Sequence, residues 1–314
     1  MRACRRFLLF FGIMGSMFLI YQWEISQINK AEGIHQLQEL RKQQLREKCN
    51  AFTEGRHSFE NMSNTELRNL VVDDEHCIIY CYIPKVASTN WKKFMFVLNL
   101  SEPYQDLLSI PGELVHQPEK LTHLNSFQRP EIKAKLRHYT KFLFVRDPFT
   151  RLISAYRDKL LGYNDFYYKY FGWDILQRYG NMANPPKTKE EAFASGVRPS
   201  FHNFIQYLLD PQTQKQPFDS HWRHMHHLCN PCTIQYDFIG HQETLQQDTE
   251  QLLKMLKLQD DIKFPPVYKN VTSSASVSRW FSTVPLEDRR KLYELYEEDF
   301  RLFGYSKPSE LLDG

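Results

Sequence analysis

The chain has 314 residues, which is enough for one large domain or two small ones, and its 42% hydrophobic and 14% aromatic content is that of a globular protein. Its formal charge is +3, and because residues 1–48 hold eight basic and four acidic side chains, the rest of the chain carries about −1. A body so close to neutral excludes nucleic-acid binding through a strongly basic domain. Any polyanionic ligand would need a local basic groove, since overall attraction is absent.

The N-terminus begins with three arginines, at positions 2, 5 and 6, followed by an uncharged run of 17 residues at 7–23. A run of this length is within the range that spans a bilayer. A cleaved signal peptide or a buried core helix are the alternatives, but no small-residue cleavage site follows and the run lies at the very start of the chain. The arginines predict a cytosolic tail at 1–6 and a type II signal-anchor transmembrane helix at 7–23.

Residues 24–48 are rich in Gln, Glu and Lys, with apolar residues near helical spacing. This pattern predicts a helical stem, and we place the lumenal stem at 24–70 and the main domain at 71–314.

The first motif of the main domain is an apolar run at Ile78–Tyr82 that stops near Pro84 and is followed by Trp91 and Leu98 at helical spacing. A strand, a tight loop and a helix in this order surround one point with backbone N–H groups, which attract phosphate or sulfate. Lys85 adds a mobile positive charge to that point. The segment therefore predicts a loop that grips the 5′ side of a nucleotide.

Two observations qualify this loop. It has no glycine and carries its lysine first, so it is not the common phosphate loop. Most strand-to-helix turns are ordinary turns capped by a hydroxyl, and here Ser88 or Thr89 would be the cap.

The second motif follows another apolar run, Lys141–Val145. Asp147 is placed as a helix N-cap, and Pro148 stands at the first helical position, which is a strong start signal. Arg146 lies at the strand end and Ser154 two turns into the helix. An arginine fork together with a hydroxyl suits a phosphate monoester.

The remaining pattern alternates strands with helices and predicts an α/β single domain with a central parallel sheet covered on both faces. Phe238–Ile239 is expected to be a short buried strand. Helices are expected at 130–138 and around the apolar sets near 201–209, 245–256 and 292–303. Ligand sites in such sheets lie beyond the carboxyl ends of the strands, where both motifs fall.

Together the two motifs resemble the paired signature of the Golgi carbohydrate sulfotransferases, and within them the chondroitin 4-O-sulfotransferase and HNK-1 sulfotransferase branch, most of all the chondroitin 4-sulfotransferases. The similarity runs from about Val71 to the C-terminus. The stretches that carry it are Pro84-Lys85-Val86-Ala87-Ser88-Thr89-Asn90-Trp91-Lys92, Phe144-Val145-Arg146-Asp147-Pro148-Phe149-Thr150-Arg151-Leu152-Ile153-Ser154-Ala155, His221-Trp222, Leu228-Cys229-Asn230-Pro231-Cys232, Tyr236-Asp237-Phe238-Ile239-Gly240 and Leu302-Phe303-Gly304-Tyr305. One departure is Ser88, where the family usually has cysteine; serine is still small and can donate a hydrogen bond.

The resemblance implies the sulfotransferase fold with its P-loop-like strand-loop-helix, and 3′-phosphoadenosine 5′-phosphosulfate as the sulfate donor, without a metal. It implies that Lys85 is catalytic and stabilises charge on the bridging oxygen as the S–O bond breaks. The donor-binding residues that it implies are Pro84, Lys85, Val86, Ala87, Ser88, Thr89 and Asn90 for the 5′ phosphosulfate, and Arg146, Asp147, Pro148, Phe149, Thr150, Arg151, Leu152, Ile153 and Ser154 around the 3′-phosphate.

A base must also remove the proton of the acceptor hydroxyl, and a histidine suits this role. His116 and His123 lie between the two motifs, where related sulfotransferases place a catalytic histidine, and we favour His116. Glu243 is interpreted as a structural carboxylate or as the partner of a basic group.

The family resemblance predicts transfer to the 4-O position of N-acetylgalactosamine in chondroitin or dermatan, inside the Golgi lumen, by a single-pass type II protein of the Golgi membrane. The acceptor would be an anionic glycan, and no nucleic-acid partner is expected. Alternatives are another glycan acceptor, such as N-glycan N-acetylgalactosamine or a terminal glucuronate, and a non-catalytic membrane-tethered glycan binder. A kinase-like phosphoryl transferase is disfavoured because Gly-Lys-Ser/Thr is missing. The oligomeric state is not predicted.

The six cysteines place five thiols on the lumenal side, an odd number that leaves at least one unpaired within the chain. Cys229 and Cys232 have metal-ligand spacing, and four histidines lie just upstream, so a zinc site is an alternative to the favoured structural disulfide or core cysteines. Sequons at Asn61, Asn99 and Asn270 are expected glycosylation acceptors in a lumenal protein.

Overall fold

The computed structural model describes residues 33, 35–51, 58–100, 102–162, 164–266 and 274–313. The predicted signal anchor at 7–23 and the sequon at Asn270 lie outside these residues. Among the helices that are described, none has the length and apolar character needed to cross a membrane.

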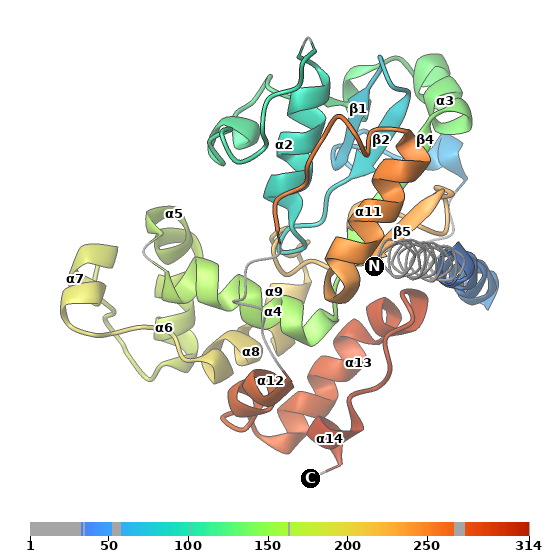
Figure 1. Cartoon of the computed structure of the whole chain (residues 1–314). Coiled ribbons are helices and arrows are strands. Elements are labelled where there is room, and N and C mark those ends of the chain that lie inside the picture. Colours follow the sequence, from blue (N-terminus) through green and yellow to red (C-terminus); the bar gives the residue numbers. More distant parts are fainter. Residues whose placement is uncertain are drawn as a thin grey trace, which may run out of the picture.

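A five-stranded sheet forms the centre of the upper part of Figure 1, in the order β3-β1-β2-β4-β5. Its strands are β1 Leu70–Asp73, β2 Ile78–Cys81, β3 Thr122–His123, β4 Thr140–Val145 and β5 Phe238–His241. The β2, β4 and β5 strands run parallel, whereas β1 is antiparallel to both β2 and β3.

The predicted all-parallel sheet is therefore wrong, and the sheet is mixed. The reason is the connection between β1 and β2, which spans only residues 74–77 and includes Cys77 at a φ of +54°. A parallel neighbour needs a crossover of a dozen or more residues, whereas so short a turn reverses the chain. The β2, β4 and β5 strands are joined by long helical connections and are parallel as expected.

Helices surround the sheet and form most of the lower part of the molecule (Figure 1). Those predicted from apolar spacing are found, with small shifts at their ends, as α2, α3, α4, α8, α11 and α13. After an N-terminal helix over residues 35–51, the described α-helices are α2 Ser88–Leu98, α3 Arg129–His138, α4 Pro148–Tyr156, α5 Asp165–Tyr167, α6 Trp173–Tyr179, α7 Lys189–Ala194, α8 Phe201–Leu209, α9 Pro211–Gln214, α10 Met225–Cys229, α11 Leu245–Leu256, α12 Ser274–Phe281, α13 Leu286–Leu302 and α14 Ser309–Leu312.

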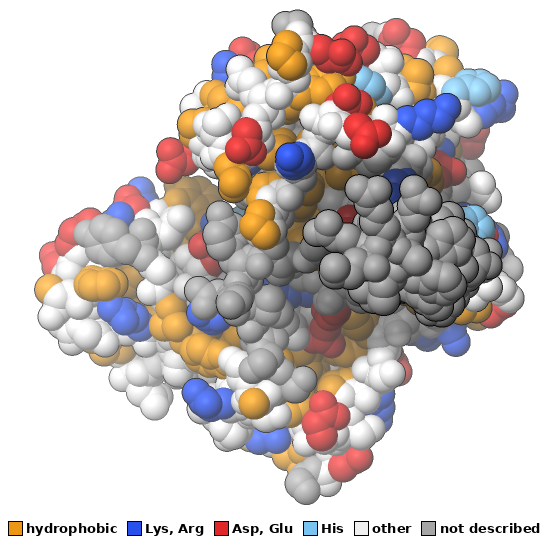
Figure 2. Space-filling view, in the orientation of Figure 1, with side chains coloured by type: hydrophobic (Ala, Val, Ile, Leu, Met, Phe, Trp, Pro, Cys, Tyr) orange, Lys and Arg blue, Asp and Glu red, His pale blue; other side chains and the backbone are white. Residues whose placement is uncertain are grey.

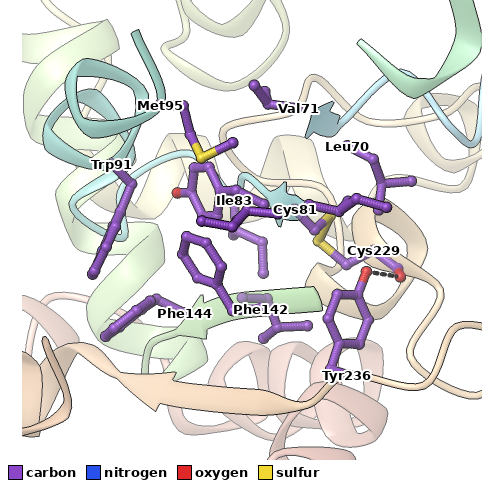
Figure 3. Packing of buried hydrophobic residues seen from close by; sticks show 14 of the residues in the cluster. Leu70, Val71, Cys81, Ile83, Trp91, Met95, Phe142, Phe144, Cys229 and Tyr236 are labelled. Atoms are coloured by element: carbon purple, nitrogen blue, oxygen red, sulfur yellow. Dashed lines mark hydrogen bonds between the residues drawn. A yellow bond between two sulfur atoms is a disulfide. The ribbon is translucent and has the colours of Figure 1, made fainter. Parts of the chain in front are cut away.

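Two apolar cores hold these layers together. In the sheet core, the fully buried Trp91 of α2 stacks on Phe144 with ring centroids 4.6 Å apart and meets Phe142 edge-on at 5.1 Å (Figure 3). In the helical core, Phe149 of α4 stacks on Phe281 at 4.6 Å. Because α2 and α4 begin at the two ligand motifs, this packing fixes where both helices start.

The helix over residues 35–51 is attached to the sheet at β5. The Arg41 guanidinium donates to Ile239 O at 2.9 Å, to Asp248 Oδ2 at 2.8 Å and to Thr244 Oγ1 at 3.0 Å. Gln38 exchanges two hydrogen bonds with the backbone of Ile239. Part of the segment predicted as a stem thus packs on the main domain, while the domain boundaries themselves remain predictions.

Two disulfides join distant segments. Cys49 pairs with Cys232, and Cys81, at the end of β2, pairs with Cys229 (Figure 3). The favoured interpretation of Cys229 and Cys232 as structural disulfide cysteines is confirmed. Because both sulfurs are in disulfides, neither can serve as a thiolate ligand of zinc. Cys77 is free and exposed, as the odd number of thiols requires.

Replacing Arg41 with alanine should lower the free energy of unfolding by about 3 kcal/mol, because it leaves the Asp248 carboxylate buried without its partner. The measurement is urea denaturation of the purified full chain with its disulfides intact. Arg46, exposed on the same helix, provides the control, and Arg46→Ala should change stability by less than about 0.5 kcal/mol. Equal effects of the two substitutions would show that the helix is not anchored through Arg41.

Candidate functional site

The first ligand motif is a loop with two residues in the left-handed region. Lys85 has a φ of +71° and Ala87 a φ of +48°, conformations that cost roughly 1–3 kcal/mol each in non-glycine residues and that the surrounding packing must hold. Ala87 is the N-cap of α2 and has no side chain that could cap it. The expectation of a turn capped by Ser88 or Thr89 is wrong, since Ser88 is already the first helical residue. The start of α2 thus has no side-chain cap, as anion binding at a helix N-terminus requires.

The second motif has the predicted geometry. Asp147 is the N-cap of α4 and accepts from Thr150 N at 2.7 Å and from Thr150 Oγ1 at 2.8 Å, with Pro148 as the first helical residue. Arg146 precedes this cap at the end of β4 and donates from Nη1 to Lys85 O at 3.1 Å. The two motifs therefore touch, because β2 and β4 are parallel neighbours whose carboxyl ends lie at one edge.

A cavity of about 510 Å³ opens where the motifs meet, within the roughly 300–1,000 Å³ usual for small-molecule sites. Eight of the predicted donor-binding residues line it, together with the predicted base His116. The lining residues are Tyr82, Pro84, Lys85, Ala87, Ser88, Thr89, Asn90, Lys92, His116, Arg146, Ser154, Asp158, Lys159, Ser220, His221 and Gln242.

The other predicted donor-binding residues do not line this cavity. Val86 is buried in the sheet core, and Phe149, Leu152 and Ile153 are buried in the helical core. Asp147, Pro148 and Thr150 form the capped start of α4. The sequence prediction included these residues because the motif is contiguous. Only every third or fourth residue of a helix faces the same side, so α4 presents Ser154 to the cavity and its apolar residues to the core.

Arg151 has a structural role that the motif does not reveal. Its guanidinium is almost fully buried and donates to three backbone carbonyls, those of Pro84 at 3.0 Å, Arg223 at 2.7 Å and Ser220 at 2.8 Å. Burial lowers the pKa of Arg151 to about 10, which leaves it charged at neutral pH. One side chain thus fastens the first motif to the segment that supplies the opposite wall of the cavity.

Lys85 points to an acidic residue that sequence reasoning missed. Its Nζ lies 3.0 Å from Asp158 Oδ2, and Lys159 Nζ lies 3.1 Å from the same oxygen. Burial lowers the pKa of Lys85, and Asp158 opposes this shift. Burial alone would raise the pKa of Asp158, but Lys85 and Lys159 together hold it below its usual range. Consecutive residues can both reach the cavity because they lie in a π-helical turn, Arg157–Leu161, a feature common at functional sites.

Lys92 is a second lysine of the cavity that sequence reasoning left without a role. Its ammonium lies over the Tyr82 ring, 3.8 Å from the ring centroid, and the residue is only 8% exposed. Burial lowers the pKa of Lys92 to about 8, so most of these amines are charged at pH 7. With Lys85, Lys159 and Arg146, this residue makes the cavity strongly basic although the protein as a whole is close to neutral.

Three histidines near the cavity were considered as the base or could act as one, and their surroundings differ. His116 lines the cavity, with Nε2 3.1 Å from Thr89 Oγ1. His123, the less favoured base, does not line the cavity, and its Nδ1 donates to Arg68 O at 2.8 Å. His221, which was noted in a family stretch and among the histidines of the zinc alternative but not as a base, lines the cavity and has a carboxylate partner in Asp219. The sequence signal that could have found it is an aspartate two residues before a histidine in a turn.

The histidines near α10 have other partners. His226 Nδ1 lies 2.6 Å from Asp299 Oδ1, and His224 Nε2 lies 2.8 Å from Leu295 O. In the part of the chain that the structure describes, no group of three or more His, Cys, Asp and Glu side chains is placed to hold a metal ion.

Glu243 is a structural carboxylate, as interpreted from the sequence. It accepts from Asp147 N at 3.0 Å and from Tyr305 OH at 2.9 Å, and its negative charge acts on nearby Arg146. The C-terminal segment is thereby joined to the start of α4, beside the arginine of the second motif.

Of the sequons, Asn61 and Asn99 are exposed. The Asn99 amide nitrogen donates to Met95 O at 2.7 Å.

Comparison with known proteins identifies the group to which this site belongs. A model of the Sulfotransferase family matches residues 68–306, which is most of the chain. The chain belongs to the sulfotransferase family. It is therefore an enzyme.

The relatives of this sulfotransferase include carbohydrate sulfotransferase 12 from Mus musculus, 46% identical over 311 residues that cover 93% of this chain and 74% of the relative. Carbohydrate sulfotransferase 12 from Xenopus laevis is 51% identical over 275 residues, covering 83% and 66%. Carbohydrate sulfotransferase 11 from Rattus norvegicus is 38% identical over 278 residues, covering 88% and 78%. No solved structure matches this sulfotransferase.

Proposed function

We propose that this sulfotransferase transfers sulfate from 3′-phosphoadenosine 5′-phosphosulfate to the 4-O position of N-acetylgalactosamine in chondroitin or dermatan. The observation that carries the proposal is the contact between the two motifs, in which Arg146 donates to the carbonyl of Lys85 at the rim of one basic cavity. A single ligand that is phosphorylated at both ends can therefore touch both motifs.

In this proposal the 5′ phosphosulfate lies at the start of α2, where the loop backbone and the side chains of Ser88, Thr89 and Asn90 surround it. Lys85 leaves Asp158 and donates to the oxygen that bridges phosphorus and sulfur. Negative charge grows on this oxygen as the S–O bond breaks, so the interaction strengthens toward the transition state.

The 3′-phosphate lies between Arg146 and Ser154. A guanidinium that is 8% exposed offers charge-assisted hydrogen bonds in a site with little water, where they are stronger than at a surface. This phosphate distinguishes the donor from ordinary adenine nucleotides. A second hollow of about 240 Å³, lined in part by Arg146, Gln242 and Val277, adjoins this point and can receive part of the nucleoside.

An anionic glycan as acceptor fits the charge of the cavity. On the face shown in Figure 2, acidic and basic side chains are interspersed, so attraction of a polyanion depends on a local cluster. Lys92 and Lys159 supply that cluster beside Lys85. The relatives are named carbohydrate sulfotransferases, which supports a sugar hydroxyl as the nucleophile.

We further propose that the protein is a type II protein of the Golgi membrane with its catalytic domain in the lumen. Two disulfides within the described residues suit an oxidising compartment, and the uncharged run at 7–23 supplies the anchor. The sequons at Asn61, Asn99 and Asn270 would then be glycosylation acceptors.

The acceptor is tested by transfer of labelled sulfate to a panel of chondroitin, dermatan, desulfated heparin, an N-glycan that ends in N-acetylgalactosamine and a glycan that ends in glucuronate, using the purified full chain. Transfer to chondroitin or dermatan, with label at the 4-O position of N-acetylgalactosamine in disaccharide analysis, is expected. Label on N-glycan N-acetylgalactosamine or on a terminal glucuronate alone would assign another acceptor. Absence of transfer to every glycan would refute the proposal in favour of a glycan-binding role.

Lys85→Ala should reduce the rate of sulfate transfer at least 1,000-fold, because the charge on the leaving oxygen is no longer neutralised. Binding of 3′,5′-bisphosphoadenosine, measured by calorimetry, reports on whether the pocket is intact. Lys93→Ala is the matched control, since Lys93 lies on α2, the helix that follows the loop, but is not among the residues that line the cavity. Turnover of Lys85→Ala close to that of the control would refute the role of Lys85.

Arg146→Ala should weaken binding of 3′,5′-bisphosphoadenosine about 10- to 100-fold and change binding of AMP far less, because the ligands differ by the 3′-phosphate. Both dissociation constants are measured by calorimetry on the same preparations. Arg137→Ala, at an exposed site on α3, should leave both unchanged. Equal losses for both nucleotides would mean that Arg146 does not bind the 3′-phosphate.

A further inference from the structure

An aspartate and a histidine form a pair in the wall of the cavity opposite the donor loop. His221 Nδ1 lies 2.8 Å from Asp219 Oδ1, and the same oxygen accepts from the backbone N of His221 at 2.9 Å. Tyr167 contacts the imidazole edge-on, with ring centroids 5.4 Å apart and its hydroxyl 2.8 Å from Nδ1. The ring is therefore oriented by two groups that both contact Nδ1.

This arrangement determines which nitrogen of His221 carries the proton. An ionised carboxylate only accepts hydrogen bonds, and the Tyr167 hydroxyl donates to the same Asp219 oxygen, so the arrangement is satisfied when Nδ1 donates to Asp219 and Nε2 keeps its lone pair. Nε2 has no hydrogen-bond partner among the described residues, and His221 lines the cavity. The carboxylate would also stabilise the imidazolium that forms when Nε2 takes up a proton.

His116 lacks these features. Its Nε2 bonds to Thr89 Oγ1, and no carboxylate hydrogen bond orients its ring in the part of the chain described. Burial lowers the pKa of His116, and the positive charges of Lys92 and Lys159 and of His221 itself lower it further, with no acidic group in opposition. His221 thus has a carboxylate that stabilises its imidazolium, and His116 has no such partner among the described residues.

The charges around His221 place it next to the reacting groups. Burial lowers its pKa, Asp219 opposes this shift, and Lys159 and Lys85 lower it further. Lys85 and His221 line the same cavity, and the positive charge of Lys85 acts on the imidazole. The lysine assigned to the leaving oxygen and the imidazole of His221 therefore belong to one electrostatic cluster.

We propose that His221, positioned by Asp219, is the base that deprotonates the acceptor hydroxyl. This inference rests on the proposed sulfotransferase function and names the residue that completes it. Nε2 takes the hydroxyl proton as the sugar oxygen forms its bond to sulfur. The bond from sulfur to the bridging oxygen breaks with its electron pair on that oxygen, beside Lys85. The products are the sulfate ester and 3′,5′-bisphosphoadenosine, and the imidazolium returns its proton to water.

The decisive substitutions keep the shape of the site. In His221→Asn the amide NH₂ can still donate to Asp219, but no base is present. We expect kcat to fall by roughly 10²–10⁴-fold, the usual contribution of general base catalysis, with binding of 3′,5′-bisphosphoadenosine within about threefold of wild type. His116→Asn should cause a smaller loss, and His123→Asn, outside the cavity, should resemble wild type.

The pH profile separates a catalytic role from a structural one. A base must be deprotonated to act, so kcat/KM of the wild type should rise with pH through the pKa of His221. Asp219 raises that pKa, so in Asp219→Asn the acidic limb should move to lower pH while the plateau falls. In His116→Asn the limb should stay in place.

The experiment measures transfer of labelled sulfate to chondroitin from pH 5 to 9 for these full-length variants. The inference is overturned if His221→Asn keeps kcat within tenfold, or if its loss is matched by an equal loss of 3′,5′-bisphosphoadenosine binding. It is also overturned if the limb moves in His116→Asn and not in Asp219→Asn. Wild-type protein that transfers sulfate to no glycan would overturn the proposed function as well, whereas an active wild type with an active His221→Asn overturns this inference alone.

Discussion

Parallel pairing of β2 with β4 is the constraint on which the site depends. The pairing runs from Ile78 opposite Thr140 to Cys81 opposite Leu143, so both strands end at one edge of the sheet within a residue or two. Each strand is followed by a turn and a helix start, and each helix start attracts negative charge. A shift of two residues in this register would move Arg146 away from the carbonyl of Lys85, and the two motifs would no longer share a ligand.

The hydrogen bonds of Arg151 fix the distance between the two walls of the cavity. Among the described residues no carboxylate pairs with the Arg151 guanidinium, which donates instead to the carbonyls of Pro84, Ser220 and Arg223. These carbonyls belong to the donor loop and to the segment that carries His221. Burying a cation without an ion pair is costly, and the hydrogen bonds offset that cost only when all three carbonyls are in place. The geometry of the reacting groups is thus tied to the packing of α4.

The chemistry of the site comes from concentrating charge in a protein with almost no net charge. Lysines 85, 92 and 159 and Arg146 meet in one cavity, with Asp158 as the acidic side chain that pairs with two of them. Before the donor binds, Asp158 keeps the ammonium of Lys85 from being an isolated buried charge. A doubly phosphorylated nucleotide can then take the place of the Asp158 carboxylate and offer the lysines several phosphate oxygens. The lysines thus exchange one anionic partner for another and are not left buried without one.

Local signals in the sequence were sufficient for the strands β2 and β4, the N-cap at Asp147 and the cations Lys85 and Arg146, because each depends on residues only a few positions apart. They could not predict the antiparallel β1, because the reversing turn at 74–77 contains no glycine or proline to signal it. Nor could they predict the partners of the cysteines, which are separated by 148 and 183 residues. A π-helical turn brings Asp158 and Lys159 to the cavity, and the three carbonyl contacts of Arg151 hold the segment that carries Ser220 and His221. The motif around Arg151 could not show whether this cation is structural or binds a ligand. The sequence by itself determined that two strand-turn-helix motifs with a basic residue at the turn exist and in which order they occur. Only the tertiary structure decided which other side chains face them, because that depends on contacts between segments whose separation along the chain carries no local pattern.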